Sequence, residues 1–355
     1  NQIVPDKDWL KNDIVSIKSS LQNIEPRNIY IMVMESFIDP TLFPKLELPE
    51  DYLTPWMRDL QAFKNLSRSP VYGGSTAQAE FEILCGVPAK ALVGTIEFNS
   101  FGGASTSCLG TWLGTVGYRT VAQNAYKPSY FNQVKGYEGV GFTDIYFPKE
   151  YASGSDTHLQ VNFTKTSGEY MYDGDFFEQA NQYFLNTVAD ASVGLNYMLG
   201  VYGHYNFYID SERFPKIVSL DGTEFENIQN IVNQYYYRVR VIEQNVKEII
   251  ERDPSAVILV VSDHLPLTSG STNYYLERGY PNIYTNVYYL WDRGMPVHID
   301  KQVSHYDLPW ILLSLLRNDN CYSESCVEVD YKGRYEQVMA HAMRVKSPEL
   351  ENLLQ

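Results

Sequence analysis

The chain has 355 residues, of which 44% are hydrophobic and 20% are charged, and its formal net charge is −15. This composition supports a folded core and excludes global disorder, and the length allows one large α/β domain or two modest ones. The acidic balance argues against a nucleic-acid partner and against non-specific docking on an anionic membrane.

The sequence contains no run of about eighteen apolar residues and no visible signal peptide. Its first residue is Asn1 rather than Met. We therefore expect a soluble domain of a longer protein, whose targeting or membrane segments lie outside this sequence.

Residues 1–25 have the pattern of an amphipathic helix that ends before Pro26. Apolar side chains recur along it at helical spacing: Trp9, Leu10, Ile14, Ile17 and Leu21. Two interpretations stay open for this segment, namely a linker helix that leads from a membrane segment and a helix that packs on the domain.

Behind this helix, apolar runs that are typical of strands alternate with helical patterns. We expect strands at 28–34, 118–122, 194–201, 256–261 and 286–291. We expect helices at 109–117, 176–188, 226–252, 306–316 and 335–345. This alternation predicts an α/β fold with a mainly parallel central sheet and helices on both faces. A small C-terminal subdomain from about residue 280 is an alternative for the last part of the chain.

The stretch 71–86 combines a sharp turn with the start of a helix. A strand-like lead ends at Gly73 and Gly74, and a helical pattern opens behind Ser75 and Thr76. Paired glycines permit a sharp turn, and the N–H groups at a helix start attract an anion such as a phosphate. A hydroxyl at such a turn is either a helix cap or a nucleophile.

Two of the expected strands end in groups that bind metals. Glu35 follows one central strand, and Asp263-His264 follow another. The carboxyl ends of parallel strands are where open α/β sheets place their ligands. Carboxylate and imidazole groups suit Mn²⁺, Zn²⁺ or, less well, Mg²⁺. Together with the glycine turn they predict a metal site beside Ser75 and Thr76, one of which would be the nucleophile.

The chain has four cysteines, at Cys85, Cys108, Cys321 and Cys326. No second pair at ligand spacing accompanies the closely spaced last two, so disulfides are favoured over a metal site. Of the three possible pairings, Cys85–Cys108 with Cys321–Cys326 is the simplest. Disulfides indicate an oxidising compartment, meaning the periplasm or the cell exterior.

Four motifs follow one another along the chain: MESF at 34–37, GSTAQAEFE at 74–82, GHYNF at 203–207 and SDH at 262–264. In this order they resemble the lipoteichoic acid synthase and phosphoglycerol transferase family of the alkaline phosphatase and sulfatase superfamily. The resemblance covers roughly residues 26–317 and implies an alkaline phosphatase/sulfatase-like catalytic domain there. Residues 1–25 would then be the linker helix, and residues 318–355 a C-terminal extension packed on the same domain.

The resemblance implies a role for each matching residue. Glu35, Thr76, Asp263 and His264 match the positions that hold one divalent cation, usually manganese. Thr76 matches the nucleophile that carries a covalent phosphoglycerol group, which leaves Ser75 as the helix cap. His204 matches a histidine that contacts the substrate and protonates the leaving group.

The resemblance also implies substrate contacts in the loop that we expect at 123–133. The binding candidates are Asn124, Tyr126, Gln133 and His204. Gln133 stands where the family carries an arginine, and Asn206 stands where the second motif usually has a proline. Recognition of the donor group therefore departs from the family pattern.

The segment around Cys85 and Cys108 is similar to the branch of the family that modifies periplasmic glucans, in which these cysteines would bridge the nucleophile helix to the next helix. The implied activity is metal-dependent transfer of phosphoglycerol from a phosphatidylglycerol-type donor to a cell-envelope glycan. The implied location is the periplasmic or extracellular face of a bacterial cytoplasmic membrane.

Three alternatives remain for the function. Phosphoethanolamine transfer and phosphodiester hydrolysis would use the same site, whereas a degenerate glycan-binding domain would have no catalysis. Sulfatase activity is disfavoured, because the residues that follow Thr76 lack the Cys or Ser context of sulfatase nucleophiles.

Overall fold

The computed structural model describes residues 4–22, 24–43, 46–91, 96–149, 158–161, 170–189, 193–220, 226–268, 273–277, 280–319 and 330–348. Within these residues one nine-stranded sheet has the order β4-β3-β5-β1-β6-β7-β2-β9, and β8 pairs with β7. The strands are β1 (Ile29–Met34), β2 (Asn65–Arg68), β3 (Arg119–Asn124), β4 (Asp144–Tyr146), β5 (Gly194–Gly200), β6 (Val257–Ser262), β7 (Thr285–Asp292), β8 (Met295–Pro296) and β9 (Val303–Ser304).

The sheet is mainly parallel, as predicted. Strands β4, β3, β5, β1 and β6 pair in parallel, and β7 is antiparallel to β6, β2 and β8. Every residue of β1 and of β6 is buried. Burial on both faces explains why these two strands are continuous apolar runs and not alternating ones.

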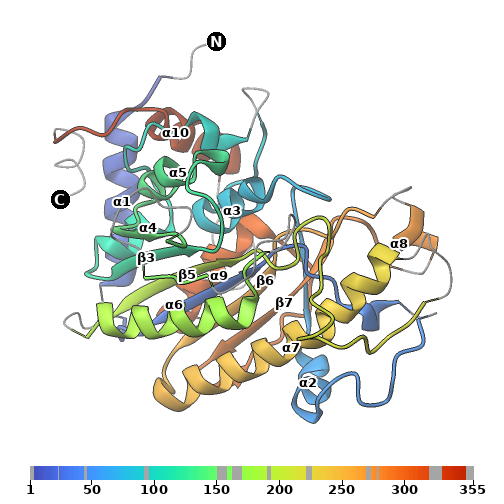
Figure 1. Cartoon of the computed structure of the whole chain (residues 1–355). Helices are drawn as coiled ribbons and strands as arrows, with labels where there is room; N and C mark the ends of the chain where they lie inside the picture. Colours follow the sequence, from blue (N-terminus) through green and yellow to red (C-terminus); the bar gives the residue numbers. More distant parts are fainter. Residues whose placement is uncertain are drawn as a thin grey trace.

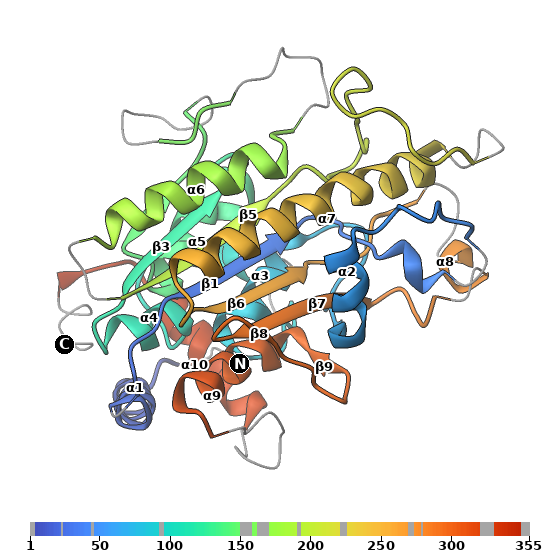
Figure 2. The same cartoon turned by 90° about the horizontal axis from the view of Figure 1, so that it is seen from below.

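Helices cover both faces of this sheet, which confirms the predicted fold class (Figure 1). On one face lie α2 (Pro55–Leu60), α6 (Asp173–Thr187) and α7 (Glu226–Arg252). On the other lie α1 (Lys7–Leu21), α3 (Thr76–Cys85), α4 (Leu109–Gly114), α5 (Gln133–Val140), α9 (Leu308–Arg317) and α10 (Tyr331–Ala342). The short helix α8 (Asn273–Glu277) lies at one end of the molecule, outside both layers (Figure 2).

The N-terminal helix α1 packs on the body of the domain, against α4, α9 and α10. Its apolar stripe is buried: Leu10, Ile14, Ile17 and Leu21. Asp6 caps it by accepting hydrogen bonds from the backbone N–H groups of Asp8 and Trp9. Among the described residues, no helix is both long enough and apolar enough to cross a bilayer.

Three predictions about elements are corrected. Residues 71–72 form no strand, and the strand before the glycine turn is the polar β2, which an apolar pattern does not reveal. Gln123 and Asn124 end β3 and do not begin a loop. Finally, β7, β8 and β9 join the central sheet, so the strands between residues 285 and 304 belong to the main domain.

Candidate active site

The order of the strands brings the predicted site residues together. Strand β1 lies between β5 and β6, and its last residue, Met34, pairs with Gly200 of β5 and with Ser262 of β6. Three parallel strands therefore end at one edge of the sheet. The residues that follow them meet there: Glu35 after β1, His204 after β5, and Asp263 and His264 after β6.

A left-handed turn delivers Thr76 to the same edge. Gly73, Gly74 and Ser75 have φ values of 69°, 152° and 64°. A Cβ atom on Gly73 would lie 2.8 Å from the Cβ of Leu267, so this position has no room for a side chain. The turn makes Thr76 the first residue of α3.

Ser75 occupies the N-cap position of α3, but its side chain makes no capping hydrogen bond. The prediction that the Ser75 hydroxyl caps the helix is therefore wrong. A capping side chain needs an extended backbone, whereas Ser75 has φ 64° and ψ 41°. The turn determines the path of the chain here, and the hydroxyl does not.

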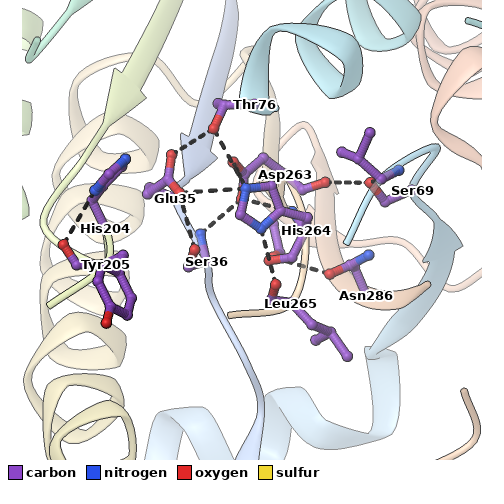
Figure 3. A network of polar contacts seen from close by, with 12 residues as sticks. Glu35, Ser36, Ser69, Thr76, His204, Tyr205, Asp263, His264, Leu265 and Asn286 are labelled. Carbon is purple, nitrogen blue, oxygen red and sulfur yellow. Dashed lines mark hydrogen bonds and ion pairs between the residues drawn. The ribbon is translucent and has the colours of Figure 1, made fainter. Parts of the chain in front are cut away.

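The four predicted metal-binding side chains converge (Figure 3). The hydroxyl of Thr76 donates a hydrogen bond of 2.8 Å to Oε2 of Glu35 and lies 3.5 Å from Nε2 of His264. The same Nε2 lies 3.5 Å from Oε1 of Glu35 and 3.3 Å from Oδ2 of Asp263. Ligand atoms of Glu35, Asp263 and His264 all lie within 4.8 Å of one another, so they could hold one metal ion.

The hydrogen bonds around these residues leave suitable atoms for a cation. Nδ1 of His264 is 3.0 Å from the carbonyl oxygen of Leu265, which can only accept. In the neutral ring Nδ1 therefore carries the hydrogen, and Nε2 keeps the lone pair that a metal ligand needs. Oδ1 of Asp263 accepts from the N–H groups of Ser36 and His264, while Oδ2 is buried and accepts no hydrogen bond from the described residues. This orphaned oxygen fits a metal ligand.

The two buried carboxylates also favour a cation electrostatically. Burial and the charge of Glu35 raise the pKa of Asp263 well above its usual value. Burial also tends to raise the pKa of Glu35. The charges that His264 and His204 carry when protonated, together with hydrogen bonds from two hydroxyls, nevertheless hold the pKa of Glu35 below its usual value. Bringing two carboxylates together in a buried site is unfavourable, and a divalent cation would offset that repulsion.

A sulfatase family profile matches residues 27–317. The chain belongs to the sulfatase family. A relative from Rhizobium meliloti, named for cyclic β-1,2-glucan modification, is 24% identical over 245 residues, or 67% of this chain. The chain spans only 36% of the length of that relative.

Two solved structures of bacterial proteins share the fold. The lipoteichoic acid synthase LtaP from Listeria monocytogenes has a TM-score of 0.65 and 16% identity, with 86% of this chain and 78% of the other covered. The Streptococcus pyogenes phosphoglycerol transferase GacH, in complex with sn-glycerol-1-phosphate, has a TM-score of 0.64 and 15% identity. The match covers 97% of this chain and 90% of the GacH chain. The sulfatase match confirms the superfamily that the motifs predicted, and these structures confirm the fold.

In this member of the sulfatase family, a small, partly open pocket lies beside Glu35 and Thr76. The four predicted substrate-binding residues all line it: Asn124, Tyr126, Gln133 and His204. Tyr130 also lines it, and four further lining residues were not predicted to bind substrate: Lys127, Phe131, Leu199 and Val201. Leu199 and Val201 gave no signal because they belong to a buried strand and its end. Lys127 could have been found from the sequence, because it is a cationic residue directly after the predicted contact Tyr126.

His204 lies on the side of Glu35 opposite His264 (Figure 3). Its Nδ1 is 3.3 Å from the carbonyl oxygen of Tyr205, and its ring packs against Tyr126 and Tyr170 at centroid distances of 6.2 and 4.8 Å. The preceding Gly203 allows the turn to approach β1, since a Cβ atom there would lie 2.1 Å from the carbonyl oxygen of Glu35.

Asn124 lines the pocket, but both ends of its amide are engaged. Its Nδ2 donates to the hydroxyl of Tyr137 at 3.0 Å, and its Oδ1 accepts from the N–H of Tyr126 at 2.8 Å. These bonds fix the backbone at Tyr126, which stacks on His204. Asn124 thus helps to shape the pocket wall.

The predicted disulfide between Cys85 and Cys108 is present and joins the end of α3 to the start of α4. The second predicted pair, Cys321 and Cys326, lies outside the described residues.

Proposed function

We propose that this domain transfers phosphoglycerol from a phosphatidylglycerol-type lipid to a cell-envelope glycan, through a covalent intermediate on Thr76. The observation that carries the proposal is the Thr76 hydroxyl at the start of α3, hydrogen-bonded to Glu35 and bordering a pocket. The names of LtaP, GacH and the glucan-modifying relative support the same reaction class.

The residues that would hold a divalent cation are Glu35, Thr76, Asp263 and His264. Mn²⁺ is our first choice, with Mg²⁺ and Zn²⁺ as alternatives, because the donors are carboxylate, hydroxyl and imidazole groups. When bound, the cation would lower the pKa of the hydroxyl and neutralise charge on the attacked phosphate.

In the first step, Oγ1 of Thr76 attacks the phosphorus in line while Glu35 accepts the hydroxyl proton. The bond from phosphorus to the diacylglycerol oxygen breaks, and the imidazole of His204 gives that oxygen a proton. Free N–H groups at the start of α3 favour the negative phosphoryl oxygens. Phosphoglycerol is then joined to Thr76.

In the second step, a glycan hydroxyl attacks the same phosphorus. His204 now takes the hydroxyl proton, and the bond from phosphorus to Oγ1 of Thr76 breaks. Thr76 recovers its proton from Glu35, so the site returns to its starting state. Because the acceptor is a cell-envelope glycan and Cys85–Cys108 is a disulfide, we place the reaction in the periplasm or at the cell exterior.

The test is to incubate the protein with phosphatidylglycerol and Mn²⁺ and to analyse the Thr76 peptide by mass spectrometry. We expect a phosphoglycerol adduct on Thr76 that disappears when an acceptor glycan is added, and none in Thr76→Ala. An adduct that forms only from phosphatidylethanolamine would instead identify a phosphoethanolamine transferase. A protein that binds neither Mn²⁺ nor lipid would contradict an enzymatic role.

A further inference from the structure

The side chain of Gln133 lines the pocket, and its amide is hydrogen-bonded to a buried carboxylate. Gln133 lines the pocket and is only 3% exposed. Its Nε2 donates a hydrogen bond of 2.5 Å to Oε2 of Glu80. Its Oε1 is buried and has no hydrogen-bond partner among the described residues. The amide therefore has one end anchored and one end without a partner.

Glu80 is a firm anchor for this amide. It lies on α3 and is fully buried, and its Oε1 accepts hydrogen bonds from the hydroxyls of Tyr137 at 2.6 Å and Tyr197 at 2.8 Å. An ionised carboxylate can only accept hydrogen bonds, so Gln133 must turn its N–H₂ group toward Glu80. The orientation of the amide is thereby fixed.

A buried acceptor without a partner is unfavourable, and each such group in a folded protein calls for an explanation. Oε1 of Gln133 cannot face a phosphate oxygen, because both atoms are acceptors. An ammonium group would be a poor partner, because it would lose its hydrating water and gain only one neutral oxygen in exchange. The carboxylate of Glu80 would not help to bind it, because Glu80 already accepts three hydrogen bonds. A hydroxyl group is a suitable partner.

We propose that Glu80 is a positioning residue that holds Gln133 so that its Oε1 accepts a hydrogen bond from a hydroxyl of the transferred group. The inference rests on the proposed function and narrows it: the donor head group bears a hydroxyl, as glycerol does. The arginine that the family pattern places at this position would bind an anion, whereas the amide oxygen of Gln133 selects a hydrogen-bond donor.

The experiment compares three lipid donors at pH 8: phosphatidylglycerol and its two analogues that each lack one head-group hydroxyl. Burial raises the pKa of Glu80 to about 7, although hydrogen bonds from Tyr137, Gln133 and Tyr197 oppose the rise, so the carboxylate is ionised at pH 8. For the wild type we expect kcat/KM to fall at least about tenfold with one of the two analogues. In Gln133→Met, which lacks the acceptor, this difference should shrink to less than about threefold.

Glu80→Gln tests the positioning role. This change lets an amide N–H₂ group face Gln133, which then no longer has a fixed orientation, so the difference between the donors should again shrink. Glu97→Gln is the matched control, because Glu97 is equally buried but accepts its hydrogen bonds from Lys90, Ala91 and Tyr335 and not from Gln133. The control should keep the wild-type preference between donors.

Several outcomes would overturn the inference. One is an equal kcat/KM of the wild-type enzyme for phosphatidylglycerol and for both analogues. This result does not depend on whether any variant folds. Another is an unchanged donor preference in Gln133→Met, or a transfer that proceeds only from phosphatidylethanolamine. Equal losses for all donors in Glu80→Gln would reduce Glu80 to a structural role. Failure of the proposed function is distinguishable, because phosphatidylglycerol would then give no transfer and no adduct on Thr76.

Discussion

The hydroxyl of Thr76 lies close to two other candidate metal ligands, since it donates a hydrogen bond to Glu35 and lies 3.5 Å from Nε2 of His264. Each of these side chains is held in place by neighbours of its own. Leu265 orients the ring of His264 through its carbonyl, and Ser69 donates a hydrogen bond of 2.6 Å to the carbonyl of Asp263. A site that is fixed in this way loses little orientation when a substrate binds.

Replacing Thr76 by Ala should lower phosphoglycerol transfer by about a thousandfold or more, because no other group replaces the nucleophile. Folding and Mn²⁺ binding should persist, since three other ligands remain. Turnover assays, circular dichroism and metal analysis check these outcomes. Activity close to that of the wild type would refute the mechanism.

The residues of the metal site carried local signals in the sequence. Glu35 and Asp263-His264 each follow an apolar strand, and Thr76 follows two glycines. Glu80 and Leu199 carried none, because their roles depend on which elements pack together and not on a local pattern. Sequence reasoning therefore found the candidate metal-binding residues but not the residues that support the pocket.

Both ends of α3 are constrained. It begins after Ser75, whose left-handed backbone is unfavourable for a residue with a side chain, and it ends at Cys85, which is bonded to Cys108. The first constraint aims Thr76, and the second ties the far end of the helix to α4. The whole of α3 is buried, which leaves it no room to shift.

Replacing both Cys85 and Cys108 by Ala should lower the free energy of unfolding by about 3 kcal/mol, because the unfolded chain is no longer restricted by a closed loop. The loop spans a sequence separation of 23 residues. Urea unfolding of the oxidised wild type and of the double variant measures the difference. A variant as stable as the wild type would show that packing alone holds α3 and α4 together.

Not every element could be predicted from its sequence. The strands β1 and β6 were predictable because each is a continuous apolar run, and α7 because its buried stripe is long. By contrast, α5 contains Gly136 and Gly139, which are unusual in a helix. Cβ atoms there would lie 2.8 Å from Phe98 and 2.5 Å from Phe101, so close packing explains these glycines, and it is visible only in the fold.

For the molecule as a whole, the net charge of −15 includes carboxylates that are buried as well as exposed ones. Burial raises the pKa of Glu82 to about 8, with smaller contributions from neighbouring carboxylates and an opposing hydrogen bond from the N–H of Ala89. A carboxyl group whose pKa is raised on folding stabilises the folded state at low pH. That contribution is lost as the pH rises from about 4.5 through about 8.

Glu82→Gln should therefore stabilise the protein, relative to the wild type, more at pH 8.5 than at pH 5. The gain in free energy of unfolding over the wild type should be larger at the higher pH by about 4 kcal/mol, since the amide never has to ionise. Urea unfolding at both values measures it, with the exposed Glu50→Gln as a baseline. The same gain at both pH values would contradict the raised pKa.

A second prediction concerns the stability of the molecule with and without metal. Asp263→Asn removes one of two adjacent buried charges, so the metal-free variant should unfold at a higher temperature than the metal-free wild type. Mn²⁺ at about a thousand times its Kd should stabilise the wild type by about 4 kcal/mol but leave the variant almost unchanged. Thermal unfolding with Mn²⁺ and with EDTA tests both parts. If Mn²⁺ stabilises both proteins equally, Asp263 is not a ligand.

The place of β1 between β5 and β6 has a consequence for how the protein opens. Strand β1 has a partner strand on each side and every one of its residues from Ile29 to Met34 is buried, so its amides reach water only when the centre of the sheet opens. Hydrogen–deuterium exchange in β1 should then occur only through global opening, more slowly than in the edge strand β4. Partial unfolding would then begin at the edge strands, and the candidate metal-binding residues would stay together until the central strands unfold.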